Sequence, residues 1–502
     1  MAALAQTPAA LEERLSRVRT GRTLARPPIA PEVTPNPHSG TPRREIGPDL
    51  RFPMSLPENP HRQRSDTRRR SSESKPKRKP KSGPWYWLAV VMCIVAVVGG
   101  YFWYTSARIL QHPIAIDYGP ADPPFPNALG PLVGAEFMTG NSVELQINGA
   151  EFFPSMLEAI RGAKKTITLE TYIWTPGKVS EDFIFALMDA ARAGVKVHVL
   201  VDGMGTLKFK DDDRDRLQEA GVEIYKYGRQ KWWEVKPNIN HRTHRKILVV
   251  DGRIGFTGGM CIDDSWDGDA ENEKVWRETQ VRVEGPTVRQ MQSAFAANWL
   301  QTTSRLLLGE DYYPEVAPSG SVVAQCYKSG PADAPEYVRI GYLFAIAAAR
   351  RTIDISQAYF VPDDLAVQTL IAARNRGVRV RIIVPAINDS RFGRAVSRSR
   401  WAPLLEAGVE IYQYLPAMYH PKTMSVDDTL VTIGSANFDN RSFSINDEVL
   451  LNVLDQGIGA RHLQMFEADL KRSEQVTPEQ HANRPFYIKA ADHIAGIFRS
   501  QF

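Results

Sequence analysis

The pattern of apolar and polar positions along the chain alternates between the two periods of regular secondary structure. Apolar residues three and four apart are typical of amphipathic helices, and short continuous apolar runs are typical of buried strands. From residue 150 onward the two kinds of segment alternate with short connections, which predicts an α/β fold, a sheet covered by helices on both faces. The predicted elements are a helix over 150–163, a strand over 166–174, a helix over 181–193 and a strand over 195–201, followed in the second half by a helix over 337–350, a strand over 352–360, a helix over 364–376 and a strand over 378–384.

The second half of this pattern repeats the first. The text EAGVEIYKY at 219–227 recurs as EAGVEIYQY at 406–414, and such an internal repeat predicts two similar units related by pseudo-two-fold symmetry. A site that needs residues of both units then lies at their interface, outside the strand ends. The predicted boundaries are a first unit at 136–305, a connection at 306–335, a second unit at 336–475 and a C-terminal tail at 476–502. The tail has a loosely helical apolar pattern, which favours docking on the second unit, with contact to a membrane as the alternative.

A different pattern precedes the two units. Residues 85–104, WYWLAVVMCIVAVVGGYFWY, include no charge, and twenty such residues in a helix suffice to cross ~30 Å of hydrocarbon. Aromatic residues at both ends are typical of a membrane interface, so we predict a single transmembrane helix. A signal peptide is the alternative, but the apolar core is long and begins far from Met1. Residues 1–84 are predicted to be a disordered basic region, and residues 105–135 a Pro-rich linker.

The charges beside this apolar segment predict its orientation. The whole chain has a formal charge of +5, but ten Lys and Arg residues are concentrated between Arg62 and Lys81. Because basic residues are retained on the cytoplasmic side of a membrane, the N-terminus is predicted to be cytoplasmic. The two units are then expected on the outer, periplasmic side of the cell membrane.

Two copies of one short motif carry the candidate chemistry. Both copies read His-x-Lys-x-x-x-x-Asp, and in both a glycine follows seven residues after the Asp. A duplicated spacing with matched glycines points to a duplicated structural role. The motif residues are His244, Lys246 and Asp251 in the first unit and His420, Lys422 and Asp427 in the second, followed by Gly258 and Gly434.

The spacing of this motif suits phosphate chemistry. Residues two apart in a strand point to the same face, so each His lies beside its Lys. The ammonium neutralises phosphate oxygens, while the imidazole attacks phosphorus or transfers a proton. Asp251-Gly252 is a hairpin turn signal, and each Asp lies about 20 Å of strand beyond its His at ~3.3 Å per residue. We therefore expect the two aspartates to fix the hairpins.

At these motifs the chain resembles the phospholipase D superfamily, and within it the bacterial cardiolipin synthase-like branch. The matching text includes NHRTHRKILVVDGRIGFTGGM, WRETQVRVEGP and GSANFDNRSFSINDE, within residues 136–475. The resemblance implies two tandem phospholipase D-like units around one active site. It also implies that His244, Lys246, Asp251, His420, Lys422 and Asp427 are the catalytic set, that Ser435 and Asn437 bind the substrate phosphate, and that Glu278 and Glu448 are the acids that hold the second ring nitrogen of the histidines.

The first copy departs from the family pattern. Gly259 replaces a serine, and Cys261 stands where asparagine is usual. A thiol cannot donate a hydrogen bond as an amide does, so we expect the second unit to contribute more of the phosphate contacts.

The resemblance implies a membrane-anchored phosphatidyltransferase that joins two phosphatidylglycerol molecules into cardiolipin and glycerol through a phosphohistidine intermediate. His244 is the implied nucleophile and His420 the implied acid, although the sequence leaves the opposite assignment open. A hydrolase or a nuclease on the same scaffold is the alternative function, and RQKWWEVK at 229–236 suits a nucleic-acid groove or a lipid interface equally well. The expected partners are a phospholipid and a membrane, with no nucleic acid.

No cofactor is expected, because the sequence contains neither a Cys/His cluster with zinc spacing nor a Gly-rich phosphate loop before a helix. The three cysteines imply no disulfide framework.

Overall fold

The computed structural model describes residues 83–105, 110–228 and 240–501. All of them belong to the compact unit Ser82–Phe502. The predicted disordered region, apart from its last two residues, and the segment RQKWWEVK at 229–236 lie outside the described residues. The apolar segment forms helix α2 (Pro84–Thr105). Among the described residues, no helix is long and apolar enough to cross a membrane.

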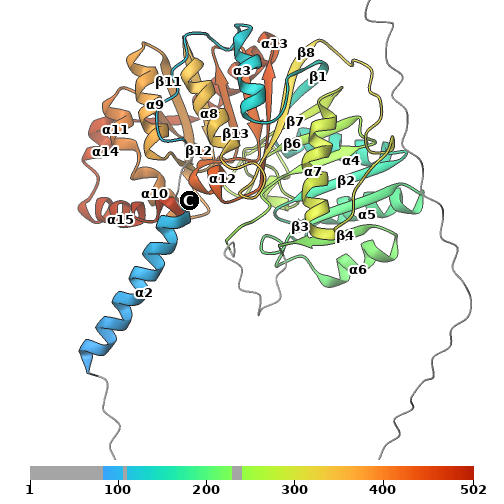
Figure 1. The fold of residues 1–502 in the computed structure, drawn as a ribbon, viewed down its shortest axis with the longest axis horizontal. Helices are drawn as coiled ribbons and strands as arrows, with labels where there is room; N and C mark the ends of the chain where they lie inside the picture. The colour runs from blue at the N-terminus through green and yellow to red at the C-terminus, as the bar shows by residue number, and fades with distance from the viewer. Residues whose placement is uncertain (1–82, 106–109, 229–239, 502) are drawn as a thin grey trace, which may run out of the picture. The chain divides into compact units, whose positions relative to one another are not determined.

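One large mixed sheet runs through the rest of the described chain (Figure 1). The elements of the first repeat are β1 (Met138–Ile147), α4 (Asn148–Gly162), β2 (Thr166–Thr171), α5 (Lys178–Arg192), β3 (Lys196–Asp202), α6 (Asp211–Glu219), β4 (Glu223–Tyr227), β5 (Ile247–Val250), β6 (Ile254–Gly258), η1 (Asp264–Trp266), β7 (Thr279–Glu284) and α7 (Val288–Thr303).

The second repeat follows the same order and ends in additional helices. Its elements are β8 (Val322–Ser329), α8 (Tyr337–Ala348), β9 (Thr352–Gln357), β10 (Phe360–Val361), α9 (Asp364–Asn375), β11 (Arg379–Ile387), α10 (Arg391–Arg398), α11 (Trp401–Glu406), β12 (Glu410–Met418), β13 (Lys422–Val426), β14 (Leu430–Gly434), β15 (Phe438–Asp439), α12 (Asn440–Ser444), β16 (Glu448–Leu454), α13 (Gln456–Leu470), β17 (Ser473–Val476), α14 (Pro478–Ala482), α15 (Phe486–Gly496) and η2 (Arg499–Gln501).

The strand order contains the expected two-fold relation. It reads β17-β12-β11-β9-β13-β14-β16-β8-β1-β7-β6-β5-β2-β3-β4, so the order on one side of the β8–β1 pair mirrors the order on the other, with β17 added at the edge of the second repeat. Within each repeat three strands are parallel, β2-β3-β4 and β9-β11-β12, and the motif strands pair antiparallel to β2 and β9. The two repeats therefore share one sheet, joined by the antiparallel pairing of β1 with β8.

All eight helices and strands predicted from periodicity are present, with ends shifted by a few residues. Two of the predicted connecting segments contain regular structure. The expected linker at 105–135 contains α3 (Pro124–Leu132), because Phe125, Leu129 and Val133 recur every four residues and pack in the core of the second repeat. The expected connection at 306–335 contains β8, whose residues lie at the centre of the sheet.

Helices cover both faces of the sheet in each repeat. In the first, α4 and α5 pack on the β2 and β3 side chains of one face, and Phe295 and Trp299 of α7 pack on Leu200 of the other. In the second, α8 and α9 take the places of α4 and α5, and Phe466 of α13 packs beside Ile383 on the opposite face. Within each repeat the motif His lies at one end of its strand and the motif Asp at the other.

The motif aspartates form the same turn in both repeats. Asp251 and Asp427 have φ angles of 52° and 54°, a conformation that Asp tolerates better than most residues. The carboxylate of Asp251 accepts hydrogen bonds from the backbone N–H groups of residues 164–166 at 2.7 to 2.9 Å. Asp427 binds residues 350–352 in the same way, at 2.7 to 2.9 Å. Each Asp thus ties its hairpin to the start of the neighbouring strand.

This geometry makes the aspartates a test of stability. We expect Asp251→Ala and Asp427→Ala each to destabilise the fold by about 2–4 kcal/mol, because three backbone donors lose their acceptor. Asp→Asn at the same positions should cost less, because Asn tolerates the positive φ. Thermal unfolding of the purified variants is the measurement, with the exposed helix residue Glu158→Ala as the control. Melting temperatures of both Ala variants equal to that of the control would contradict this assignment.

Candidate functional site

The two motif segments meet where the repeats exchange backbone hydrogen bonds. The N–H of His244 donates to the carbonyl of Asp447 at 2.9 Å, and the N–H of His420 donates to the carbonyl of Arg277 at 2.8 Å. Short parallel bridges join Thr243 to Asp447 and Arg277 to Tyr419. Each histidine is therefore placed beside the segment that precedes a glutamate of the other repeat.

The glutamates complete this exchange. Nδ1 of His244 lies 2.9 Å from Oε1 of Glu448, and Nδ1 of His420 lies 2.5 Å from Oε2 of Glu278. Both carboxylates are fully buried. The two acids expected from the sequence are therefore brought to the histidines, each paired with the histidine that belongs to the other repeat. The contact leaves Nε2 of each ring as its remaining nitrogen.

The matched glycines allow this close approach. A Cβ atom on Gly434 would lie 2.2 Å from the carbonyl oxygen of Val449, and one on Gly258 would lie 2.7 Å from that of Thr279. Val449 and Thr279 each follow a site glutamate in sequence. Without a side chain at the glycine, the neighbouring strand can bring its glutamate up to the histidines.

The motif lysines are buried beside the histidines. Nζ of Lys246 donates to the carbonyl of His244 at 2.7 Å, and Nζ of Lys422 donates to that of His420 at 2.6 Å. The same Nζ of Lys422 lies 3.1 Å from both ring nitrogens of His420. The expected placement of His and Lys side by side is observed, and it gathers two cations in a water-poor site.

Aromatic side chains surround the two imidazoles, and the sequence analysis did not identify them. The Tyr172 ring packs edge-on against His244 at 5.0 Å between centroids. Trp266 and Trp276 pack against His420 at 5.3 and 5.1 Å, and Nε1 of Trp266 donates to Glu278 at 3.3 Å. Trp276 stands two residues before Glu278 in the text that carried the resemblance, which is the signal that could have identified it.

The two glutamates have different environments. Glu448 accepts hydrogen bonds from the hydroxyls of Ser435 at 2.5 Å and Ser442 at 2.8 Å. In the first repeat Gly259 takes the place of the serine, and a Cβ there would lie 2.4 Å from Glu278. Ser435 thus contacts a carboxylate, which differs from the direct phosphate contact that the resemblance implied for it.

These environments move the pKa values of the glutamates in opposite directions. Burial raises the pKa of Glu278 to about 7, against the lowering effect of Lys422. Burial also acts to raise the pKa of Glu448, but His244, Lys246 and the Ser435 hydroxyl lower it below its ordinary value. At neutral pH Glu448 is therefore ionised, and Glu278 is partly protonated.

Burial also governs the bases of the site. It lowers the pKa of His244 to about 4, assisted by the charges of both lysines. The pKa of His420 lies well below its ordinary value, through burial and then the charges of Lys422 and Lys246. Burial lowers the pKa of Lys422 to about 8. Each lysine influences both histidines, so the two motifs form one electrostatic unit.

Asn437 and Cys261 occupy matched positions in the two repeats. The side chain of Asn437 is 7% exposed, and its Oδ1 has no hydrogen-bond partner among the described residues. Cys261 is 1% exposed, and burial raises the pKa of its thiol. Only the second repeat therefore offers an amide at this position.

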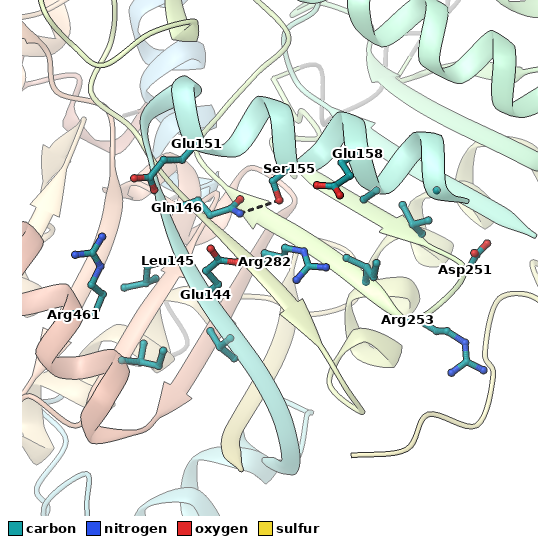
Figure 2. A pocket seen from close by; sticks show the side chains of 16 residues that line it. Glu144, Leu145, Gln146, Glu151, Ser155, Glu158, Asp251, Arg253, Arg282 and Arg461 are labelled. Carbon is teal, nitrogen blue, oxygen red and sulfur yellow. Dashed lines mark hydrogen bonds between the residues drawn. The ribbon is translucent and has the colours of Figure 1, made fainter. Parts of the chain in front are cut away.

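The motif aspartates lie at the other ends of their hairpins, away from the histidines. Asp251 lies at one end of a groove of ≈ 1030 Å³ between α4 and the β1 and β7 strands (Figure 2). Gln146 donates to Ser155 within this groove at 2.9 Å. Of the predicted site residues, Asp251 alone lines it. The groove is thus separate from the histidine site.

The described part of the chain contains no group of three or more His, Cys, Asp or Glu side chains arranged to hold a metal ion.

Comparison with known proteins places the chain in a family. The family described as "Cardiolipin synthase, PLD-like domain" matches residues 156–299 and 342–470. The chain is 32% identical to cardiolipin synthase 2 of Staphylococcus epidermidis over 361 residues, 72% of this chain and 74% of the relative. It is 35% identical to cardiolipin synthase A of Pseudomonas syringae pv. syringae over 348 residues, 69% of this chain and 72% of the relative.

A solved structure supports the same fold. The phosphatidylserine synthase of Haemophilus influenzae Rd KW20 aligns with 75% of this chain and 99% of its own, with a TM-score of 0.56 and 14% identity. The regions that the family model matches include both motif segments and parts of both repeats. The chain therefore belongs to the cardiolipin synthase family of phospholipase D-like enzymes.

Proposed function

We propose that this protein is a phosphatidyltransferase that makes cardiolipin and glycerol from two molecules of phosphatidylglycerol. The observation that carries the proposal is the pair of histidines, each held through Nδ1 by a buried glutamate of the other repeat, beside two buried lysines. Such an arrangement supplies a nucleophile, an acid and positive charge for one phosphodiester. The curated relatives are named cardiolipin synthases, which supports this choice of products.

In the first step Nε2 of His244 attacks the phosphorus of phosphatidylglycerol. The bond between phosphorus and the glycerol oxygen breaks, and Nε2–H of His420 protonates the departing oxygen. The products are glycerol and a phosphatidyl group bound covalently to His244. Because the phosphodiester energy is retained in the P–N bond, no nucleotide is needed.

In the second step the glycerol hydroxyl of another phosphatidylglycerol attacks this phosphorus. Nε2 of His420 accepts the hydroxyl proton, the P–N bond breaks, and cardiolipin leaves. Lys246, Lys422 and the amide of Asn437 stabilise the charge that develops on the phosphoryl oxygens.

The difference between the two glutamates supports this assignment of roles. Ionised Glu448 accepts the Nδ1–H of His244, which leaves the lone pair of Nε2 free to attack. Glu278, with a pKa raised to about 7 by burial, shares a proton with Nδ1 of His420 and thereby keeps Nε2 protonated. The second imidazole is thus prepared to act as the acid.

The lipid assay tests the function directly. With phosphatidylglycerol as sole lipid, we expect cardiolipin and glycerol to form together, with little phosphatidic acid. His244→Ala and His420→Ala should each lower turnover by about 10³-fold or more, and the double variant should add little. The exposed His112→Ala is the control. Phosphatidic acid as the main product would indicate a hydrolase, and cleavage of oligonucleotides without lipid products would indicate a nuclease.

The pKa values predict the pH profile of kcat/KM. The acid that protonates glycerol must hold its proton, and Lys422 must keep the positive charge that stabilises the phosphoryl oxygens. Activity should therefore fall as pH rises through the Glu278 pKa of about 7 and the Lys422 pKa of about 8. The acid side should fall only near the His244 pKa of about 4. In Glu278→Gln the proton is held by His420 alone, whose pKa is well below its ordinary value, so the alkaline fall should move to lower pH. An unchanged profile in this variant would refute the proton-sharing pair, and Glu158→Gln is the control.

We propose that the enzyme works at a cell membrane, anchored by residues 85–104, with its N-terminus cytoplasmic and both repeats on the outer side. The support is the absence of charge in that segment and the ten basic residues before it. Protease added to intact spheroplasts of a bacterial host should then digest the repeats and spare an N-terminal tag. Digestion of the tag alone would reverse the orientation.

A further inference from the structure

Helix α15 exposes its large apolar side chains. Phe486 is 83% exposed, Tyr487 72%, Ile494 58% and Ile497 69%. A helix on a water-facing surface normally turns such residues toward the core and keeps polar residues outside. The orientation of α15 is the reverse, so its outer face needs an apolar partner.

The orientation is enforced by what α15 buries. The carboxylate of Asp492 accepts hydrogen bonds from Arg398 at 2.8 Å and Arg484 at 2.5 Å. Ala495 packs with the apolar residues Val361, Ala395 and Val396, which lie in and beside α10. The inner face is thus made of small and ion-paired residues, and this docking holds the apolar face outward. The docking expected for the C-terminal tail is confirmed, and it leaves the apolar pattern of the tail uncovered.

The exposed face continues onto α10 and is bordered by basic residues. The Phe392 ring, 44% exposed, lies 6.0 Å from that of Phe498. Exposed cations adjoin these rings in sequence, Arg391 beside Phe392 and Arg499 beside Phe498, and Lys489 is exposed on α15 itself. We call Phe486, Tyr487, Ile494, Ile497, Phe498 and Phe392 the apolar rim.

The apolar rim lies at the edge of the sheet that carries the histidines. Nη2 of Arg499 contacts the carboxylate of Asp364 at 3.3 Å. Asp364 is the first residue of α9, the helix that comes after the C-terminal end of β9. The carbonyl of Ser500 accepts a hydrogen bond from Asn440 of α12, and Asn240, four residues before His244, contacts η2 at 3.4 Å. Figure 1 shows α15 and the C-terminus at this edge, near α12.

The first repeat contributes exposed apolar residues at the same edge. Met204 and Leu207, in the loop after β3, are 51% and 72% exposed. The carboxylate of Asp202 accepts hydrogen bonds from the backbone N–H of Met204 and from that of Thr243, the residue before His244. Exposed apolar groups therefore flank the site from both repeats.

We propose that the apolar rim is a bilayer-contacting surface, which enters the interfacial layer of a membrane containing anionic phospholipid and holds the histidine site at the headgroups. An apolar helix face bordered by cations matches the acyl chains and the anionic headgroups of such a membrane. This inference rests on the proposed function, in which the substrate is an anionic lipid that does not leave the bilayer.

Chain length supports the choice of a bilayer over a second protein. Leu110 and Ser500 line one small cavity, so the globular part begins beside η2. Only four residues separate Leu110 from the last residue of α2, and five extended Cα steps span about 17 Å at most. An anchor at 85–104 therefore keeps the apolar rim near the membrane.

Labelling tests the contact without relying on turnover. The full chain would carry His244→Ala, so that the lipid composition stays constant, and Cys93→Ser, since Cys93 is the exposed cysteine of the described residues. A polarity-sensitive fluorophore is then placed at Ile497→Cys or, as the matched control, at Leu308→Cys. These positions are 69% and 67% exposed, and Leu308 lies near Asp311, which contacts Lys196 at the opposite edge of the sheet.

In vesicles of phosphatidylcholine and phosphatidylglycerol in equal parts, the label on the Ile497→Cys variant should shift to the blue and be quenched by spin-labelled lipid. The label on the Leu308→Cys variant should remain in water. The proposal would be overturned by a water-exposed label on the Ile497→Cys variant, or by efficient disulfide cross-linking of two copies of the unlabelled variant through the introduced thiol.

A second measurement connects the contact to catalysis. In the otherwise native chain, Ile494→Ser with Ile497→Ser should lower the ratio of turnover on vesicles to turnover on monomeric short-chain phosphatidylglycerol by about tenfold. The control pair Leu306→Ser with Leu308→Ser should leave this ratio unchanged. An unchanged ratio in the Ile pair would refute the role of the apolar rim. Absence of lipid products from the wild-type enzyme in both assays would instead refute the proposed function and leave the labelling result standing.

Discussion

The structure depends on an exchange of partners between the two repeats. Each site histidine is oriented by a buried carboxylate of the other repeat, and the backbones beside them exchange hydrogen bonds in the same crossed manner. An imidazole held at Nδ1 has a defined tautomer and direction, so neither repeat can orient its own histidine alone. The continuous sheet through the β8–β1 pair gives this exchange a rigid base. Both repeats accordingly belong to one compact unit.

The exchange is symmetric in position and asymmetric in chemistry. Glu448 accepts hydrogen bonds from two serine hydroxyls. Beside Glu278, Gly259 offers no hydroxyl and leaves no room for a side chain, and the indole N–H of Trp266 donates to the carboxylate. Burial acts to raise the pKa of both carboxylates; for Glu448 it is outweighed by His244, Lys246 and the Ser435 hydroxyl, whereas for Glu278 burial prevails over Lys422. In the proposed mechanism, two identical motifs thereby act as a nucleophile and an acid at the same pH. The fold supplies the duplicated geometry, and a few neighbours differentiate the roles.

The edge of the sheet that carries this chemistry is also the edge where apolar groups lie exposed. Helices that follow parallel strands begin there, among them α10 with the exposed Phe392, and so does the loop that exposes Met204 and Leu207. A phosphodiester at a bilayer surface must reach buried lysines without its acyl chains leaving the membrane. A site that opens at a strand-end edge with an apolar border meets both requirements.

The resemblance pointed to Glu278 and Glu448, and the sequence by itself determined the repeat, the α/β class and the two His-Lys pairs of the site. Local periodicity and a duplicated motif carry that information, because strands and hairpins depend on neighbouring residues. It also indicated the hairpin role of Asp251 and Asp427, since the Asp-Gly turn and the extended distance from the histidines are local properties. The prolines of the segment 105–135 predict a linker, while the core positions of Phe125 and Leu129 depend on contacts with α8.

Only the tertiary structure decided which glutamate serves which histidine. Glu448 is 204 residues from His244 in sequence, and nothing in local spacing distinguishes it from Glu278 as a partner. The aromatic walls of Tyr172, Trp266 and Trp276, and the opposite pKa shifts of the two glutamates, likewise arise from burial and from neighbours far apart in the chain. Electrostatics and packing depend on distances in space. The order of residues in the sequence does not by itself specify which distant residues come into contact in the folded chain.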